Sequence, residues 1–281
     1  AAAEDPALRE ALRPLTLDPP AWWAAFIHFA SRTAASADSV MALLQMRAAA
    51  TDAPPGDSER EPLLQRLHRD GRVADAYLLW VNGLDEPALA HLGYVFDGGF
   101  ELPPANSGFG WYAVVPRNGA FRIATGATHG MAGERALYIG FSGKRAPFGH
   151  VYQNLFLGPG RYEVSGQVRP EDLRARRGLQ WRVQCIAGGT QLLGESELFE
   201  GRDTWRRFAF DIEVPEGCAG QILRLHSAGN REVDHEVQGS IWFDALRIAR
   251  KPEPAPEPAS PHSGEPAQSP AESVVSDGAG G

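Results

Sequence analysis

The chain has 281 residues, 43% hydrophobic and 22% charged, which is the composition of a folded globular protein rather than of a wholly disordered chain. No run of apolar residues approaches the length that spans a bilayer. The net charge is −8, but five acidic residues of the segment 252–281, which has no Lys or Arg, leave only −3 on the rest. This balance gives no electrostatic reason to expect a nucleic acid as partner.

The first third of the chain is rich in Ala and Leu and predicts helices over residues 21–93. We expect the preceding segment, 1–20, to be flexible. In the first helix, the spacing of Trp22, Phe26 and Phe29 is typical of one buried helical face.

Two later helices are expected to pair. A capping box between Ser58 and Glu61 predicts the start of one, and its apolar stripe follows. The next helix carries Val73, Tyr77 and Trp80 on one face. The pair resembles a degenerate tetratricopeptide unit, although no repeat of about 34 residues recurs. Two helices packing on the next domain are the alternative interpretation.

From residue 94 to 250 the pattern changes to short runs of period two, separated by turns rich in Gly and Pro. Apolar and polar residues alternate in 162–169 and 180–185, and further strands are predicted over 205–214, 221–226 and 241–248. These features predict an α+β chain, in which a small helical region precedes an antiparallel β-sandwich (jelly roll) at 94–250. The segment 251–281, rich in Pro, Glu, Ala and Ser, is expected to be a disordered tail.

The two cysteines, Cys185 and Cys218, lie 33 positions apart, without C-x-x-C or metal-ligand spacing. The turn at 215–217 is expected to bring Cys218 close to the inward-facing Cys185, so that a disulfide forms. Such a bond would place the protein outside the cytosol. Two buried free thiols are the alternative.

Three segments resemble jelly-roll carbohydrate-binding modules of the group of families 4, 9, 16 and 22, which have a galactose-binding-domain-like fold. Residues 96–101 are similar to the N-G-G-F-E opening, 241–248 to the closing strand, and Gln153 with the hairpin at 157–166 to the middle signature. The resemblance covers about residues 94–249. With helices ahead of the module, the chain is also similar to tetratricopeptide-containing proteins of bacterial exopolysaccharide export loci.

The resemblance implies one structural calcium ion, held by oxygen ligands where the first and last strands meet. Glu101 and Asp244 match the two acidic positions of the family, whereas Ala245 replaces a second Asp. The alternative is that Glu101 is a charge at a strand edge and Asp244 caps a loop.

A sugar-binding face needs aromatic rings that stack on pyranose rings and planar polar groups that bridge hydroxyls. We expect polar residues of two strands, Gln167 with Arg169 and Arg182 with Gln184, to share one sheet face. A neighbouring strand and the rim would complete it, so that the predicted sugar contacts are Trp111, Tyr112, His150, Tyr152, Gln153, Arg169, Arg182 and Gln184. The alternative is a core position for Trp111 and an ordinary solvated polar row.

No serine-hydrolase elbow, P-loop or dinucleotide glycine pattern occurs in the sequence. We therefore expect no enzyme but a polysaccharide-binding protein, acting in exopolysaccharide assembly or export in the periplasm or cell envelope. Its partners would be the polysaccharide and envelope export proteins that contact the helical region. One alternative is an interaction scaffold of an envelope secretion complex whose sandwich no longer binds sugar, and another is a jelly-roll lyase or glycosidase.

Overall fold

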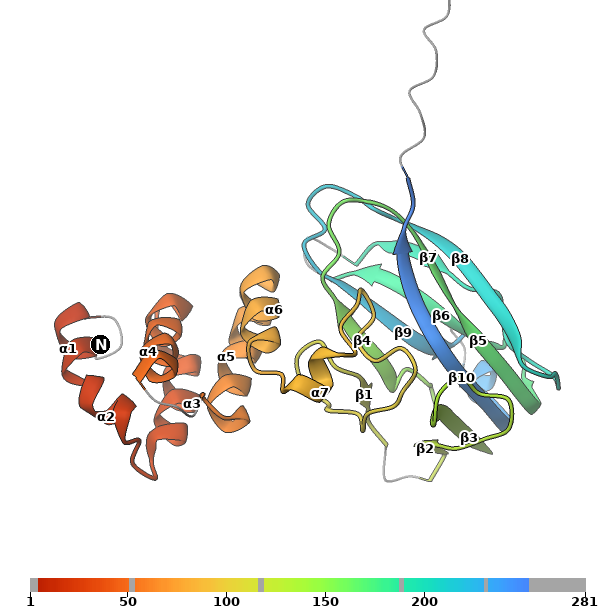
Figure 1. Cartoon of the computed structure of the whole chain (residues 1–281). Helices are drawn as coiled ribbons and strands as arrows, with labels where there is room; N and C mark the ends of the chain where they lie inside the picture. The colour runs from red at the N-terminus through yellow and green to blue at the C-terminus, as the bar shows by residue number, and fades with distance from the viewer. Residues whose placement is uncertain (1–4, 51–53, 116–118, 187–189, 230–231, 253–281) are drawn as a thin grey trace, which may run out of the picture.

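The computed structural model describes residues 5–50, 54–115, 119–186, 190–229 and 232–252, so that the tail expected at 251–281 falls, from residue 253 on, outside the described residues (Figure 1). The N-terminal part is helical, and two of its helices lie in the segment expected to be flexible. No helix in the described part of the chain is long and apolar enough to cross a membrane. The helices are α1 (Pro6–Ala11), α2 (Arg13–Leu17), α3 (Trp23–Thr33), α4 (Ala37–Ala50), α5 (Asp57–Arg69), α6 (Val73–Val81) and α7 (Glu86–Leu89).

The buried face of α3 differs from the predicted one. Trp23 and Ile27 are buried, whereas Trp22 is 51% exposed and Phe29 is 65% exposed. Both sets of residues satisfy helical spacing, and the sequence therefore offers two adjacent apolar faces. Packing of α3 against α5 decides between them.

Helix α5 carries the predicted buried stripe, Leu63, Leu64 and Leu67. The helix begins before the predicted capping box, with Gly56 as its N-cap. There the carboxylate of Glu59 accepts a hydrogen bond of 2.7 Å from the backbone N–H of Gly56. Its cap therefore does not involve Ser58.

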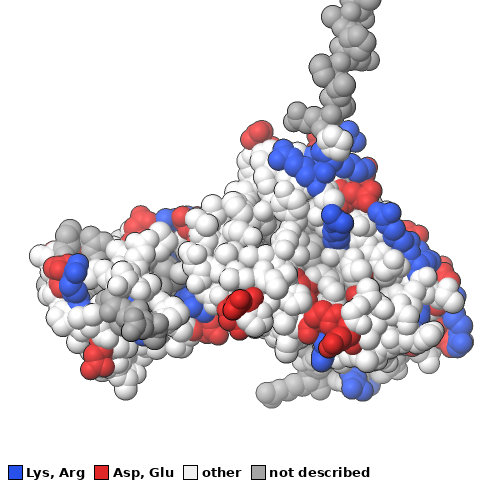
Figure 2. All heavy atoms as spheres, viewed as in Figure 1, with Lys and Arg blue, Asp and Glu red and all other residues white. Residues whose placement is uncertain are grey.

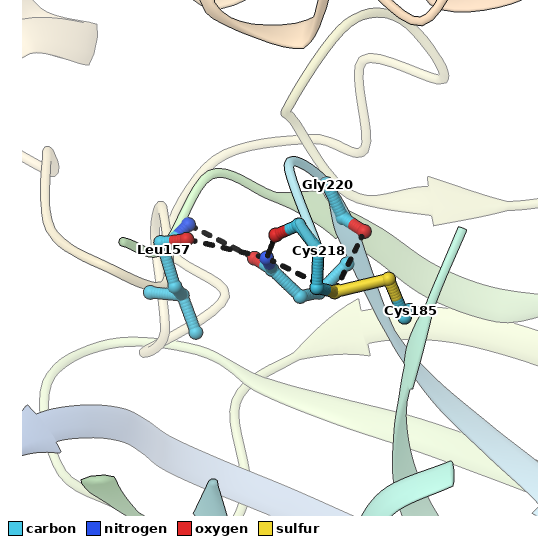
Figure 3. Close-up of a disulfide and its surroundings, with 5 residues drawn as sticks. Leu157, Cys185, Cys218 and Gly220 are labelled. Atoms are coloured by element: carbon cyan, nitrogen blue, oxygen red, sulfur yellow. Dashed lines mark hydrogen bonds between the residues drawn. A yellow bond between two sulfur atoms is a disulfide. The ribbon is translucent and has the colours of Figure 1, made fainter. Parts of the chain in front are cut away.

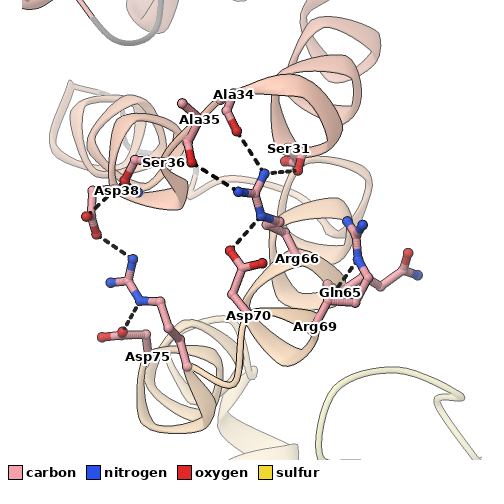
Figure 4. Close-up of polar contacts among 11 residues, drawn as sticks. Ser31, Ala34, Ala35, Ser36, Asp38, Gln65, Arg66, Arg69, Asp70 and Asp75 are labelled. Carbon is pink, nitrogen blue, oxygen red and sulfur yellow. Dashed lines mark hydrogen bonds and ion pairs between the residues drawn. The ribbon is translucent and has the colours of Figure 1, made fainter.

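Two arginines tie the helices together through polar contacts (Figure 4). Arg66 on α5 donates to the backbone oxygens of Ser31 and Ala34, at 3.1 and 3.0 Å, where α3 ends. Arg72 lies between Asp38 of α4 and Asp75 of α6, with ion-pair distances of 2.6 and 2.7 Å. These contacts satisfy polar groups at helix ends, which have no partner within their own helix.

The remainder forms two antiparallel five-stranded sheets, which confirms the predicted sandwich. The order in sheet I is β1 (Tyr112–Ala113), β4 (Val151–Leu155), β9 (Gln221–Ser227), β6 (Leu179–Cys185) and β7 (Leu192–Glu195). The order in sheet II is β2 (Phe121–Gly126), β3 (Ala136–Arg145), β10 (Glu236–Arg250), β5 (Gly160–Ala175) and β8 (Arg206–Val214). A short 3₁₀ helix, η1 (Glu232–His235), precedes β10.

Large aromatic side chains fill the space between the sheets. Trp181 of sheet I and Phe243 of sheet II are fully buried, with ring centroids 5.3 Å apart. Phe199 contacts Phe243 at the same distance of 5.3 Å. Such edge-to-face contacts add about 0.5 to 1.5 kcal/mol beyond the area that they bury.

The helical part and the sandwich share a second apolar core. Trp80 of α6 contacts Phe96 and Phe109, which precede β1, with ring centroids 5.0 and 5.6 Å away. Gly108 has a φ of 56°, and a Cβ there would lie 2.2 Å from the Trp80 ring, so only glycine allows this approach. A broad uncharged surface covers the junction in Figure 2.

Cys185 of β6 and Cys218, which precedes β9, form the predicted disulfide, with their Cα atoms 5.8 Å apart (Figure 3). The buried amide of Gln221 supports this corner. Its nitrogen donates to the backbone oxygen of Cys218 at 2.8 Å, and its oxygen accepts from the N–H of Leu157 at 2.9 Å. The disulfide therefore closes one end of sheet I over the core.

We expect the oxidised protein to be more stable than a Cys185→Ala/Cys218→Ala double variant by about 3 to 4 kcal/mol, because the bond closes a loop of 33 residues in the unfolded chain. Thermal denaturation, with thiol titration of the unfolded wild-type chain, measures this. Two titratable thiols in protein from an oxidising compartment, or equal stability of the two proteins, would contradict the prediction.

Candidate functional site

The outward face of sheet I is polar where buried and half-buried residues alternate along its central strands. On β6, Trp181, Val183 and Cys185 are buried in the core, so that the intervening Arg182 and Gln184 point outward. The same alternation on β9 places Arg224 between two buried leucines.

A row of five outward residues crosses all strands of sheet I. Tyr112 pairs with Tyr152, Tyr152 with Arg224, Arg224 with Arg182, and Arg182 with Glu195. We call these five residues the cross-sheet row. Only register places them together, since they come from five separate segments of the chain.

The first three members of the cross-sheet row are stacked. The rings of Tyr112 and Tyr152 are parallel within 7°, with centroids 4.5 Å apart, and the guanidinium carbon of Arg224 lies 4.8 Å from the centroid of the Tyr152 ring. Cation–π contact of this kind orients the guanidinium. The stacking leaves hydroxyls and ring edges, rather than ring faces, as the main contact groups of Tyr152.

The two arginines of the row have different partners. Nε of Arg182 lies 2.9 Å from a carboxylate oxygen of Glu195, which also accepts a hydrogen bond of 2.6 Å from Gln180. Arg224 forms no ion pair with any residue that the structure describes, and its buried Nε has no hydrogen-bond partner there. Among the described residues of this face, the guanidinium of Arg224 is therefore the cation without a carboxylate partner.

Two histidines lie beside the cross-sheet row. Burial, together with the positive charge of Arg182, lowers the pKa of His226 to about 4. Burial and the charge of Arg224 also lower the pKa of His150. Both imidazoles are therefore neutral at neutral pH, and Nε2 of His226 is buried without a partner among the described residues.

Two predicted sugar contacts are core residues instead. Trp111 is 4% exposed, packs on Trp181, and donates from its indole N–H to the backbone oxygen of Asp97 at 3.0 Å. Gln153 is 1% exposed, and its amide bonds both the N–H and the C=O of Phe96 at 2.9 Å. Alternation turns both side chains inward, so neither is accessible to a polymer.

Arg169 lies on the opposite face of the sandwich from Arg182, contrary to prediction. Its strand, β5, belongs to sheet II between β10 and β8, and Gln167 lies on the same strand. The guanidinium of Arg169 packs between Trp205 and Trp242, 5.2 and 5.4 Å from their ring centroids. Sequence order cannot show which strands share a sheet, because the consecutive strands β5 and β6 lie in different sheets and most neighbouring strands are not consecutive.

A groove of about 1090 Å³ borders Arg169 and Trp205. Most of its polar groups are paired within the protein, although Nε of Arg169 is buried without a hydrogen-bond partner among the described residues. Arg169 donates to the backbone oxygen of His129 at 2.8 Å and to Glu171 at 2.9 Å, and Arg202 pairs with Asp172. These contacts indicate a structural role for this cluster.

The sequence reasoning missed Arg224, His226 and Asn154. The first two lie on the predicted strand 221–226, and Asn154 follows Gln153 on β4. Their alternation with buried leucines was available in the sequence. What was missing was the pairing of this strand with both Tyr152 and Arg182.

The two predicted metal ligands do converge. A Cβ on Gly99 would lie 3.7 Å from Oε1 of Glu101 and 4.0 Å from Oδ1 of Asp244, so both carboxylates border the same point. Asp244 is fully buried, and burial, together with the charge of Glu101, raises its pKa. Each carboxylate accepts one backbone N–H of the β2–β3 connection, from Ala132 at 2.6 Å and Glu134 at 2.9 Å.

These groups fit a hard cation in charge and donor type, because two carboxylates face each other without an ion pair to any described residue. The described residues hold no cluster of three or more His, Cys, Asp or Glu side chains suited to a metal. Backbone oxygens and water would have to complete the ligand set.

No family model matches this chain, and no curated protein matches its sequence. Among solved structures, it is similar to the CBM22-1 xylan-binding domain of Paenibacillus barcinonensis Xyn10C, at 17% identity and a TM-score of 0.37, over 54% of this chain and 91% of that one. A CBM4 structure matches at 15% identity and a TM-score of 0.40, over 56% and 99% of the two chains. TmCBM61 in complex with β-1,4-galactotriose matches at 16% identity and a TM-score of 0.38, over 57% of this chain and 99% of that one. At such identities and TM-scores, the chemistry of the site has to come from its own residues.

The lowered pKa of His226 predicts a pH dependence of stability. Because the unfolded chain takes up this proton near pH 6.5 and the folded chain only near pH 4, the free energy of unfolding should fall as the pH drops between these values. His226→Gln should flatten this part of the profile, as measured by urea denaturation from pH 4 to 7.5. The exposed His28→Gln serves as control, and an unchanged profile in His226→Gln would contradict the assignment.

Proposed function

We propose that this chain binds a polysaccharide through the outward face of sheet I. The observation that carries the proposal is the cross-sheet row, in which tyrosine hydroxyls and guanidinium groups lie side by side across five strands. Planar polar groups with fixed donors suit the paired hydroxyls of sugars. Nε of Arg182, Nε of Arg224 and Nε2 of His226 are buried without a hydrogen-bond partner among the described residues, and such polar atoms further support a ligand here.

The length of the cross-sheet row favours a polymer over a single sugar. Adjacent strands are about 4.8 Å apart, so four strand spacings make the row roughly 19 Å long. Asn154 and Gln184 lie on the flanking row, on either side of Ile222. The amide nitrogen of Asn154 donates to the backbone oxygen of Gly108 at 2.9 Å, which leaves its amide oxygen and the amide of Gln184 as further contact groups. An extended chain lying across the strands could contact all of them.

We infer binding rather than catalysis for this face. Hydrolysis of a glycosidic bond generally requires two carboxyl groups about 5 to 10 Å apart on either side of the bond. Along the described part of the cross-sheet row the one carboxylate is Glu195, and Arg182 and Gln180 hold it. Release of reducing ends from a bound polymer would contradict this inference.

The setting we propose is exopolysaccharide assembly or export in the periplasm or cell envelope. The disulfide between Cys185 and Cys218 supports an oxidising compartment. The resemblance of the sequence to tetratricopeptide-containing proteins of exopolysaccharide export loci supports a role in polymer assembly or export. The helical region would contact envelope export proteins, and the exposed rings of Trp22, at the N-cap of α3, and Phe29 on α3 support such contact.

An interaction scaffold is the second candidate function, and the exposed rings on α3 favour it. In that case the helical region would bind its partner while the sandwich binds no glycan. Binding of a partner that is abolished by Trp22→Ala and Phe29→Ala, without glycan binding by the wild-type chain, would favour this alternative.

For the glycan site, we expect Tyr152→Ala to weaken polysaccharide binding at least tenfold, because the change removes both the hydroxyl and the support of Arg224. The melting temperature should change little, since the side chain lies on the outward face. Calorimetry or affinity electrophoresis with full-length protein measures the binding. Tyr138→Ala is the matched control, since Tyr138 is a half-buried tyrosine that pairs with Trp242 on the outward face of sheet II. Equal effects of both variants would contradict the placement of the site.

We also propose that Glu101 and Asp244 hold one structural calcium ion. Bound to the folded state, the ion would offset the repulsion between these two carboxylates and stabilise the sandwich. Millimolar calcium should therefore raise the melting temperature of chelator-treated protein, and Glu101→Gln should abolish the increase. Glu200→Gln, which changes an exposed carboxylate elsewhere, is the control. An equal effect of calcium on all three proteins would contradict a specific site.

A further inference from the structure

We propose that the outward face of sheet I recognises an acidic polysaccharide, one that carries sugar carboxylates, with Arg224 as the residue that binds the carboxylate. This inference rests on the proposed glycan-binding function and names the chemical class of the polymer. It concerns the charge at the centre of the cross-sheet row rather than its tyrosines.

The first observation is that two like charges lie directly opposite each other. Arg182 and Arg224 are Cα partners on the adjacent strands β6 and β9. Opposed like charges destabilise a sheet pair, so that a fold gains nothing from this arrangement by itself. An anion bound between the two guanidinium groups would remove the repulsion.

The second observation is that only one of the two charges is balanced. Glu195 pairs with Arg182 from the far strand β7. Arg224 has the Tyr152 ring on one side and no carboxylate partner among the described residues. Nε of each arginine is buried without a hydrogen-bond partner among the described residues, so the missing carboxylate is what sets Arg224 apart. A guanidinium that is partly removed from water favours a charged acceptor.

The third observation is the distribution of other charges around Arg224. His150 and His226 are neutral at neutral pH, so they add no positive charge to this face. A neutral imidazole has one donor and one acceptor nitrogen, which suits sugar hydroxyls. The described carboxylates near the row lie at its two ends, Glu195 beside Arg182 and Glu61 of α5 near Tyr112. Burial, together with the charge of Glu61, raises the pKa of the Tyr112 phenol. The positive charge is therefore confined to the centre of the face.

The geometry of the Arg224 guanidinium favours a sugar carboxylate over a neutral sugar hydroxyl as its partner. The guanidinium fork matches the two oxygens of a carboxylate, and stacking on Tyr152 limits its rotation. Because the chain as a whole carries −8, recognition has to be local rather than a result of long-range attraction. This predicts that one residue, and not overall charge, controls affinity for the acidic polymer.

The test compares polygalacturonate with fully methyl-esterified polygalacturonate, which has the same backbone without free carboxylates. Full-length protein should bind the acidic polymer at least tenfold more tightly, and Arg224→Gln should remove most of this preference. Arg224→Lys keeps the charge but loses the fork, and it should restore only part of the affinity. Arg122→Gln, which changes an exposed arginine on β2 of sheet II, is the matched charge control and should bind like the wild type.

Each outcome separates the two proposals. Equal binding of both polymers, or an equal loss in the Arg224→Gln and Arg122→Gln variants, would overturn the acidic-glycan inference and leave glycan binding intact. Binding of neither polymer, nor of neutral xylan or galactan, would overturn both. Equal binding of polygalacturonate and dextran sulfate, with no loss in Arg224→Gln, would show charge attraction without a carboxylate site and would also overturn the inference. Far-UV circular dichroism of each variant confirms that it is folded.

Discussion

The contact between Trp181 and Phe243 joins the two sheets at the centre of the sandwich, and the candidate site depends on it. With Trp181 turned inward, its neighbour Arg182 must point outward, because side chains alternate along a strand. A shift of one residue in β6 would bury Arg182 and expose the indole. The energy of the aromatic core therefore also determines which residues face a ligand.

On sheet II, the buried Phe243 fixes in the same way which side chains of β10 point inward. Directly after it, the alternation of β10 is interrupted. The register of β10 against β5 shifts between Asp244 and Arg247, and Ala245 adopts a positive φ of 50°. This bulge leaves Asp244 beneath the backbone of the β2–β3 connection, facing Glu101. A local irregularity thus creates the acidic pair, whereas regular strands create the polar face of sheet I.

The helical region contributes to the same arrangement through the shared core around Trp80. Phe96 and Phe109, which this core includes, lie on the segments that lead into β1, and the amide of Gln153 holds the backbone of Phe96. The position of Tyr112 at the edge of sheet I is therefore linked to the packing of α6. Helix α5 also borders the candidate site, since the charge of Glu61 acts on Tyr112.

Period-two alternation in the sequence was sufficient to predict the sandwich, the inward direction of Trp181 and the outward direction of Arg182, because that pattern reflects burial along a single strand. The position of Cys218 directly after the turn at 215–217, with Cys185 facing inward, was sufficient to propose the disulfide. Sequence could not show that Arg169 lies on the opposite sheet, or that Arg224 lies between Tyr152 and Arg182. Strand order joins segments that are tens of residues apart, and only the packing of the whole core determines it. The same holds for α3, where the sequence offers two adjacent apolar faces and contact with α5 buries Trp23 rather than Trp22.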